Sequence, residues 1–223
     1  MASTKSEKQR DPYDSLRTWS AITHGIGAAL GLFAAPFLLL RAYASGLPGA
    51  VPAMTIYLVS LICLYTASTL YHSLRTDVAW RIRLRKIDHL NIYYLIAGTY
   101  TPFCVLAIGG TWGLVLLIVI WSLAIAGTCV NLIWIHLPRW LTSGIYLAMG
   151  WIAIGAIVPI YRSLGAGGTF WLIFGGVLYS VGGVLYALKW PGRENLRFGC
   201  HEIFHVFILL GSIAQLVAVL HTV

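Results

Sequence analysis

The sequence predicts an all-α integral membrane protein, a seven-transmembrane-helix bundle with its N-terminus in the cytoplasm and its C-terminus outside. Three observations support this fold class: an apolar composition, seven apolar runs of spanning length, and an uneven distribution of Lys and Arg between the loops. Of the 223 residues, 59% are hydrophobic and only 10% are charged. Soluble domains carry about 25% charged residues, so the composition indicates a membrane protein.

Seven apolar runs approach or exceed the roughly 20 residues that a spanning helix needs. They lie at 19–43, 52–74, 87–108, 112–134, 140–161, 168–188 and 199–221. Residues 1–18 are polar and charged, and we expect them to form a short cytoplasmic tail. Because the connections between the runs are short and rich in glycine, residues 19–223 are predicted to form a single seven-helix membrane domain.

The positions of Lys and Arg predict the orientation, because these residues concentrate in cytoplasmic loops. Thirteen of them lie in the N-terminal tail or after the second, fourth and sixth runs, and two, Arg41 and Arg162, lie on the other side. The N-terminus is therefore placed in the cytoplasm. The same topology accounts for most of the net charge of +8, so no nucleic-acid partner is inferred from it. Some of this charge is expected to attract anionic lipid headgroups.

Ionisable side chains inside membrane spans are costly, and each is therefore a candidate for function. Those in or beside the runs are Asp88, Glu202, His24, His72, His89, His201, His205 and His221. Under the predicted topology, His72, Asp88 and His201 all lie at the cytoplasmic ends of their runs. We expect these polar side chains, from segments far apart in the sequence, to converge at one depth.

Helical spacing groups some of these side chains further, because residues four apart share a helix face. His201 and His205 share a face of the seventh run, and Ser68 and His72 share a face of the second. Zinc in catalytic sites takes three protein ligands and leaves a fourth position to water, which suits His72, His201 and His205. Three imidazoles would also accept iron, cobalt or nickel. Asp88 is expected to activate the water or support a ligand, and Ser68 to orient the water or polarise a substrate carbonyl.

Residues 201–205 also match H-E-x-x-H, the helix-borne zinc motif of metalloproteases. A soluble zinc protease needs a third ligand downstream, whereas only 18 residues follow His205 and none of them is acidic. The string is therefore interpreted as His-x-x-x-His, with Glu202 incidental to the metal and either bonded to another helix or facing the cytosol. A retinal protein is excluded as well, because the seventh run contains no lysine.

Five segments resemble the bacterial hemolysin III family, the prokaryotic branch of the progestin and adipoQ receptors, which include the adiponectin receptors. They are THGIGAALG (23–31), STLYHS (68–73), KIDHLNIYYLIAGTYTPF (86–103), YLAMGW (146–151) and FGCHEIFHVFILLGS (198–212). The resemblance implies a seven-helix protein of the bacterial plasma membrane. It implies zinc bound by His72, His201 and His205, with Asp88 contacting the water at the metal and Ser68 nearby.

The chain departs from the resemblance in its first helix. Bacterial members often carry Glu and Asn seven and four residues before the histidine of that helix, where this chain has Arg17 and Ser20. The role of His24 is therefore left open between helix packing and support of the site.

Three functions are compatible with this sequence. The first is a zinc-dependent hydrolase of a lipid amide or ester, because relatives in the wider superfamily include alkaline ceramidases; membrane lipids would be the substrates and Asp88 the general base. The second is a non-enzymatic membrane-homeostasis or receptor-like module with structural zinc. The third is cytolysis, which the family name suggests; a secreted toxin must be soluble before it inserts, and seven predicted spans argue against such a phase. The sequence does not predict an oligomeric state.

Overall fold

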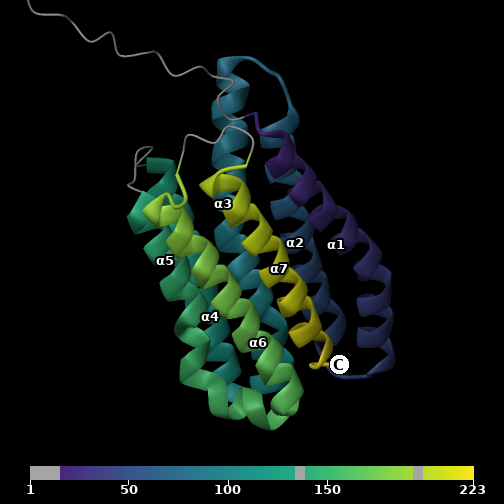
Figure 1. Ribbon diagram of the computed structural model, residues 1–223. Coiled ribbons are helices and arrows are strands. Elements are labelled where there is room, and N and C mark those ends of the chain that lie inside the picture. The colour runs from purple at the N-terminus through teal and green to yellow at the C-terminus, as the bar shows by residue number, and fades with distance from the viewer. Residues whose placement is uncertain (1–15, 134–138, 193–197) are drawn as a thin grey trace, which may run out of the picture.

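The structure is a computed structural model that describes residues 16–133, 139–192 and 198–223. The described residues are helical, and no strand occurs among them. The elements in chain order are α1 (Thr18–Ala44), α2 (Ala50–Ser73), α3 (Val78–Pro102), a π-helical segment η1 (Phe103–Ile108), α4 (Gly110–Ile133), α5 (Arg139–Trp151), a 3-10 segment η2 (Ile152–Ala156), α6 (Ile157–Leu188) and α7 (Cys200–Leu220). Figure 1 shows that they form one elongated bundle.

Six helical stretches in the described part of the chain are long and apolar enough to cross a membrane. One of them, Trp140–Leu188, has 49 residues and would be about 73 Å long as a straight helix, more than twice the roughly 30 Å of a bilayer core. It does not run straight, because Gly165 has φ 65° and ψ −173°, a conformation that glycine readily adopts. The segment before this turn, which includes α5, and the part of α6 after it run in opposite directions (Figure 1). The predicted all-helical membrane fold is confirmed, whereas seven crossings and their orientation stay predictions.

The fifth and sixth runs were predicted to end at 161 and to begin at 168, whereas α5 ends at Trp151 and α6 begins at Ile157. The other helix boundaries agree with the apolar runs to within two residues, except at the start of α3. The sequence placed this start at residue 87 and left residues 75–86 as a loop, but the helix begins at Val78. The Asp77 carboxylate caps it by accepting a hydrogen bond from the Trp80 backbone N–H at 2.9 Å. The loop interpretation was wrong because the first turns of α3 are basic, so a hydropathy criterion passes over them. The tail predicted at 1–18 lies mostly outside the described residues.

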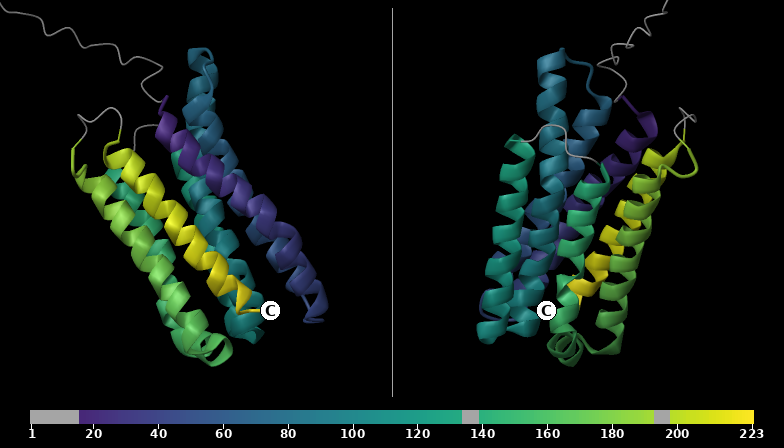
Figure 2. Two further views of the ribbon diagram at one scale, coloured as in Figure 1. Left: turned by 45° about the vertical axis from the view of Figure 1, so that its right-hand side comes forward. Right: turned by 90° about the vertical axis from the view of Figure 1, so that its left-hand side faces the viewer.

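The helices pack closely where glycine faces an aromatic ring. A Cβ on Gly27 of α1 would lie 2.4 Å from the Tyr65 ring of α2, which only a glycine permits. The Tyr65 hydroxyl in turn donates a hydrogen bond to Ser212 Oγ of α7 at 2.7 Å. α7 packs against α6 on one side and α1 on the other (Figures 1 and 2). Through these contacts α1, α2 and α7 form one side of the bundle.

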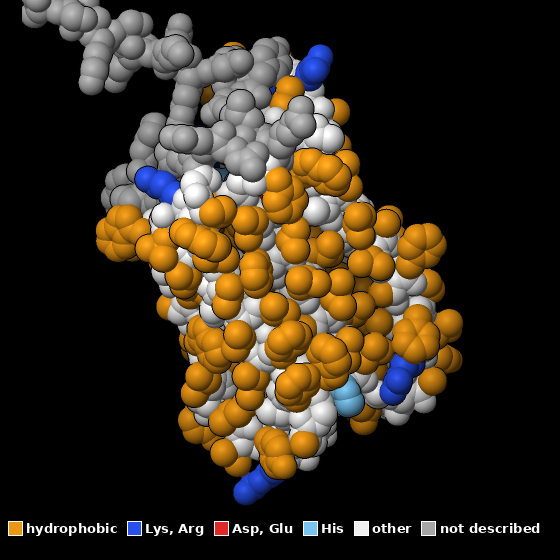
Figure 3. Space-filling view, viewed as in Figure 1, with side chains coloured by type: hydrophobic (Ala, Val, Ile, Leu, Met, Phe, Trp, Pro, Cys, Tyr) orange, Lys and Arg blue, Asp and Glu red, His pale blue; other side chains and the backbone are white. Residues whose placement is uncertain are grey.

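The surface of the bundle is apolar along most of its length. On the face seen in Figure 3, hydrophobic side chains cover the middle of the molecule, basic side chains lie toward its two ends, and no acidic side chain is visible. Exposed residues include Phe33, Trp112 and Leu188. A continuous apolar surface of this extent would be a liability in water and is what contact with lipid requires.

One end of the bundle collects segments that are distant in sequence. There α1 begins, α2 ends, and α3 and α7 begin (Figure 1). We call this the site end. The opposite end holds the last turn of α1, with Arg41, and the turn between α5 and α6 near Arg162.

Candidate metal centre

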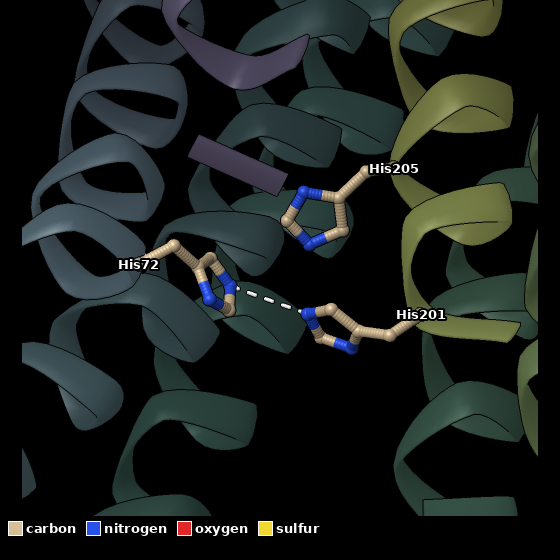
Figure 4. Close-up of side chains that lie close together, drawn as sticks. All are labelled: His72, His201 and His205. Atoms are coloured by element: carbon tan, nitrogen blue, oxygen red, sulfur yellow. Dashed lines mark hydrogen bonds between the residues drawn. The ribbon is translucent and has the colours of Figure 1, made fainter. Parts of the chain in front are cut away.

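Three histidines converge at the site end. His72 lies in the last turn of α2, and His201 and His205 lie in the first two turns of α7. One ring nitrogen from each of the three lies within 4.8 Å of the other two. The Nε2 atoms of His72 and His201 are 3.2 Å apart, and Figure 4 shows the three rings pointing toward a common centre. His72 and His205 are buried and His201 is partly buried.

The geometry of these rings fits a metal ion. Two ligands of a tetrahedral zinc with bonds of about 2.0–2.1 Å are separated by about 3.3–3.4 Å, and the distance between the His72 and His201 nitrogens is 3.2 Å. The His205 ring lies close to both of the others, with its centroid 5.0 Å from that of His72 and 4.5 Å from that of His201. An all-imidazole donor set suits zinc, iron, cobalt or nickel rather than magnesium or calcium. The three histidines could therefore hold a metal ion.

A carboxyl and a hydroxyl lie close to this centre. Asp88 of α3 and Ser68 of α2 are both buried and face one another at the wall of the same cavity as His201 and His205. Ser68 Oγ makes no hydrogen bond of normal geometry within the described segments. Both groups line the cavity and could therefore contact a molecule that enters it.

The cavity extends from the histidines into the middle of the bundle. Its volume is about 210 Å³, far more than a single water molecule needs. Beyond the polar groups at the site end, most of the wall is apolar and includes Ile92, Ile96, Ile154 and Leu172. A chamber with a polar head and apolar walls suits an amphiphile better than a fully polar solute.

His24 of α1 supports the centre from the side. Its ring stacks on His205 with centroids 3.7 Å apart and planes 19° apart, and the Tyr65 ring packs against it edge-on. Neither ring nitrogen of His24 has a hydrogen-bond partner within the described chain. Because stacked rings direct their nitrogen lone pairs in parallel planes, His24 is poorly placed to share a ligand position with His205. The sequence left its role open, and the geometry indicates that it supports His205.

Glu202 is fully buried and makes three polar contacts. Its Oε1 accepts a hydrogen bond from Arg17 Nη1 at 2.8 Å and another from Ser20 Oγ at 3.4 Å. Its Oε2 accepts the Gly199 backbone N–H at 2.8 Å, which caps the start of α7. Of the two alternatives left by the sequence, a bond to another helix is confirmed and exposure to the cytosol is wrong.

Comparisons with known proteins match nearly the whole chain. The profile of a family described as "Haemolysin-III related" matches residues 15–216. A Bacillus subtilis (strain 168) protein named "Hemolysin-3 homolog" is 42% identical over 201 residues, which cover 90% of this chain and 91% of the relative. The "Hemolysin-3" of Bacillus cereus is 41% identical over 201 residues, covering 90% and 89%. A Drosophila melanogaster "Adiponectin receptor protein" is 27% identical over 176 residues, covering 70% of this chain and 39% of the relative.

Proposed function

The chain belongs to the Haemolysin-III related family, and its bacterial relatives and its own apolar helices make it a multi-pass bacterial membrane protein. From this premise we propose that the protein is a zinc-dependent hydrolase of lipid amide or ester bonds. One observation carries the proposal. Three imidazoles that could hold a metal converge at the site end, and two of them, His201 and His205, line the polar head of a cavity that is otherwise apolar. Metal ligands beside an open chamber favour catalysis over a purely structural site.

The proposed topology has seven crossings with the site end in the cytoplasm. The stretch Trp140–Leu188 reverses at Gly165 and is long enough to cross twice. Basic residues at the site end include Arg75, Arg83 and Lys86, which follow the end of α2 or lie in the first turns of α3. Positive charge of this density marks the cytoplasmic face.

The chemistry follows from the groups around the cavity. His72, His201 and His205 would hold the zinc ion. Bound zinc supplies a Lewis acid that polarises a carbonyl and makes water a better nucleophile at neutral pH. The Asp88 carboxylate accepts a proton from the attacking water and returns it to the amine or alkoxide that departs when the carbonyl C–N or C–O bond breaks, and the Ser68 hydroxyl donates a hydrogen bond to the carbonyl oxygen of the substrate. The apolar wall holds the alkyl chain of the lipid and keeps bulk water away from the reacting bond.

The test uses protein reconstituted into liposomes that contain a ceramide or a lipid ester. Mass spectrometry of released fatty acid measures hydrolysis in wild type, in chelator-treated protein and in protein reloaded with zinc. We expect release in wild type, loss on chelation, recovery with zinc, and loss in His72→Ala. His221→Ala is the matched control, because His221 follows the far end of α7 and lies outside the histidine group. Zinc-loaded wild type that releases no fatty acid from any lipid amide or ester would contradict the proposed reaction.

A second candidate function is a non-enzymatic receptor-like or membrane-homeostasis module with structural metal. It is favoured by the origin of the ligands on α2 and α7, two helices that a metal ion would tie together. Cytolysis is suggested by the names of the Bacillus relatives alone. Dye leakage from the same liposomes separates it from hydrolysis, because a pore releases dye in the presence of chelator and an enzyme does not.

A further inference from the structure

We infer that Arg17 is a positioning residue that sets the spacing between the α2 and α7 halves of the metal centre. The inference rests on the proposed function, since it assumes that the three histidines bind a metal ion. Arg17 lies immediately before α1, outside both helices that carry the histidines. It nevertheless contacts both of them at the point where the ligands are attached.

Each of the two contacts involves a residue at or beside a ligand. The Arg17 backbone N–H donates a hydrogen bond to the carbonyl oxygen of His72 at 3.1 Å. This carbonyl belongs to the last turn of α2, where backbone acceptors lack a partner within the helix. The Arg17 guanidinium bonds to Glu202, the neighbour of His201. The one residue that precedes α1 thus joins the last turn of α2 to the first turn of α7.

The link matters because α2 and α7 have little other connection at the site end. In the described segments, α1 packs along α2 and along α7, whereas α2 and α7 themselves barely meet backbone to backbone. Apart from the contact between the His72 and His201 rings themselves, the hydrogen bonds that tie the two helices directly, from the Tyr65 hydroxyl to Ser212 Oγ and the Ile208 carbonyl, lie deeper in the bundle. Without Arg17, the separation of the His72 and His201 rings would depend on those deeper contacts.

The charge of Arg17 also keeps Glu202 in place. The Glu202 side chain is 1% exposed, and that of Arg17 is 25% exposed. Loss of the guanidinium would leave a buried carboxylate with an unpaired charge, which is strongly unfavourable. The Gly199 N–H and the start of α7 offset only part of that charge. The first turn of α7 would then shift to hydrate Glu202, and His201 would move away from His72.

The experiment compares three variants of the full-length protein in detergent. Arg17→Met keeps the aliphatic stem without the charge, and Arg17→Lys restores a cation. Arg41→Met is the matched control, since Arg41 lies at the other end of α1 and bonds to the Val223 carbonyl, far from the histidines. Chelator competition measures zinc affinity, and the absorption spectrum of the Co²⁺-substituted protein reports ligand geometry. We expect Arg17→Met to weaken zinc binding about 10- to 100-fold and alter the Co²⁺ spectrum, Arg17→Lys to recover most of the affinity, and Arg41→Met to match wild type.

Two further measurements separate this inference from the proposed function. Hydrogen exchange of the metal-free protein should speed up in peptides at the start of α7 in Arg17→Met and not in Arg41→Met. If Arg17→Met does not fold, Glu202→Gln takes its place, because it retains an acceptor for Gly199 and removes the ion pair. Zinc affinity at the wild-type level in whichever of these variants folds would overturn the inference, whereas a wild type that binds no zinc would overturn the proposed function.

Discussion

Replacement of Asp88 by asparagine should abolish hydrolysis while zinc stays bound. Asparagine has nearly the same shape as aspartate, so the packing around this buried residue of α3 is preserved. The amide cannot accept the proton of the attacking water, which is the role proposed for the carboxylate. The three histidines are untouched, and metal binding is therefore expected to persist.

The structure places the expected loss at the upper end of the range for a general base. Removal of such a group costs about 100- to 10,000-fold in rate, or about 2.7–5.4 kcal/mol at 1.36 kcal/mol per tenfold. Among the described residues, the other buried carboxylate is Glu202, and Arg17 and Gly199 already engage it. With no second carboxylate free to replace Asp88, we expect a loss of about 1,000-fold or more.

The assay is the initial rate of fatty acid release from a lipid amide in liposomes, with zinc content measured on the same samples. Asp77→Asn is the matched control, since it makes the same change on an exposed residue at the start of the same helix. Asparagine also caps helices as well as aspartate does. Wild-type turnover in Asp88→Asn, with a full complement of zinc, would refute the assignment of Asp88 as the base.

Three further predictions concern the surroundings of the centre. His24→Ala should weaken zinc binding about tenfold in a chelator competition. His24→Phe keeps a ring stacked on His205 and should bind zinc nearly as tightly as wild type. Equal losses of zinc affinity in both variants would show that the His24 nitrogens matter. Gly27→Ala should destabilise the protein by about 1–3 kcal/mol in thermal unfolding, because the new Cβ would overlap Tyr65. Gly25→Ala is the control and should not destabilise it, because that Cβ would lie 3.8 Å from Thr69. Equal melting temperatures of the two variants would contradict this packing. Chelation should lower stability by about 2.7 kcal/mol relative to protein with free zinc at 100 times its Kd, and an unchanged melting temperature would count against tight metal binding.

The convergence of the polar residues was accessible from the sequence because it depends on two regular features. The four-residue spacing puts His201 and His205 on one face of a helix, and the charge of the loops puts His72 and Asp88 at the same end as that face. The structure brings these four residues together as expected. That they bind zinc and hydrolyse a lipid stays a prediction.

The support of the centre could not be read from sequence patterns. Arg17 and Glu202 are 185 positions apart, and no periodicity relates the residue before the first helix to the first turn of the last. The departure at Arg17 and Ser20 was visible, but its meaning depends on Glu202 lying opposite both residues in space. The stacking of His24 on His205 likewise depends on how α1 crosses α7.

The central claim is that His72, His201 and His205 bind one metal ion, and metal content tests it most directly. The protein is purified in detergent without chelators, and inductively coupled plasma mass spectrometry measures the metals bound per chain. We predict about one zinc ion in wild type and in His221→Ala, and none in His72→Ala or in the double variant His201→Ala/His205→Ala. Wild type that holds no transition metal, even after exposure to zinc, would contradict it.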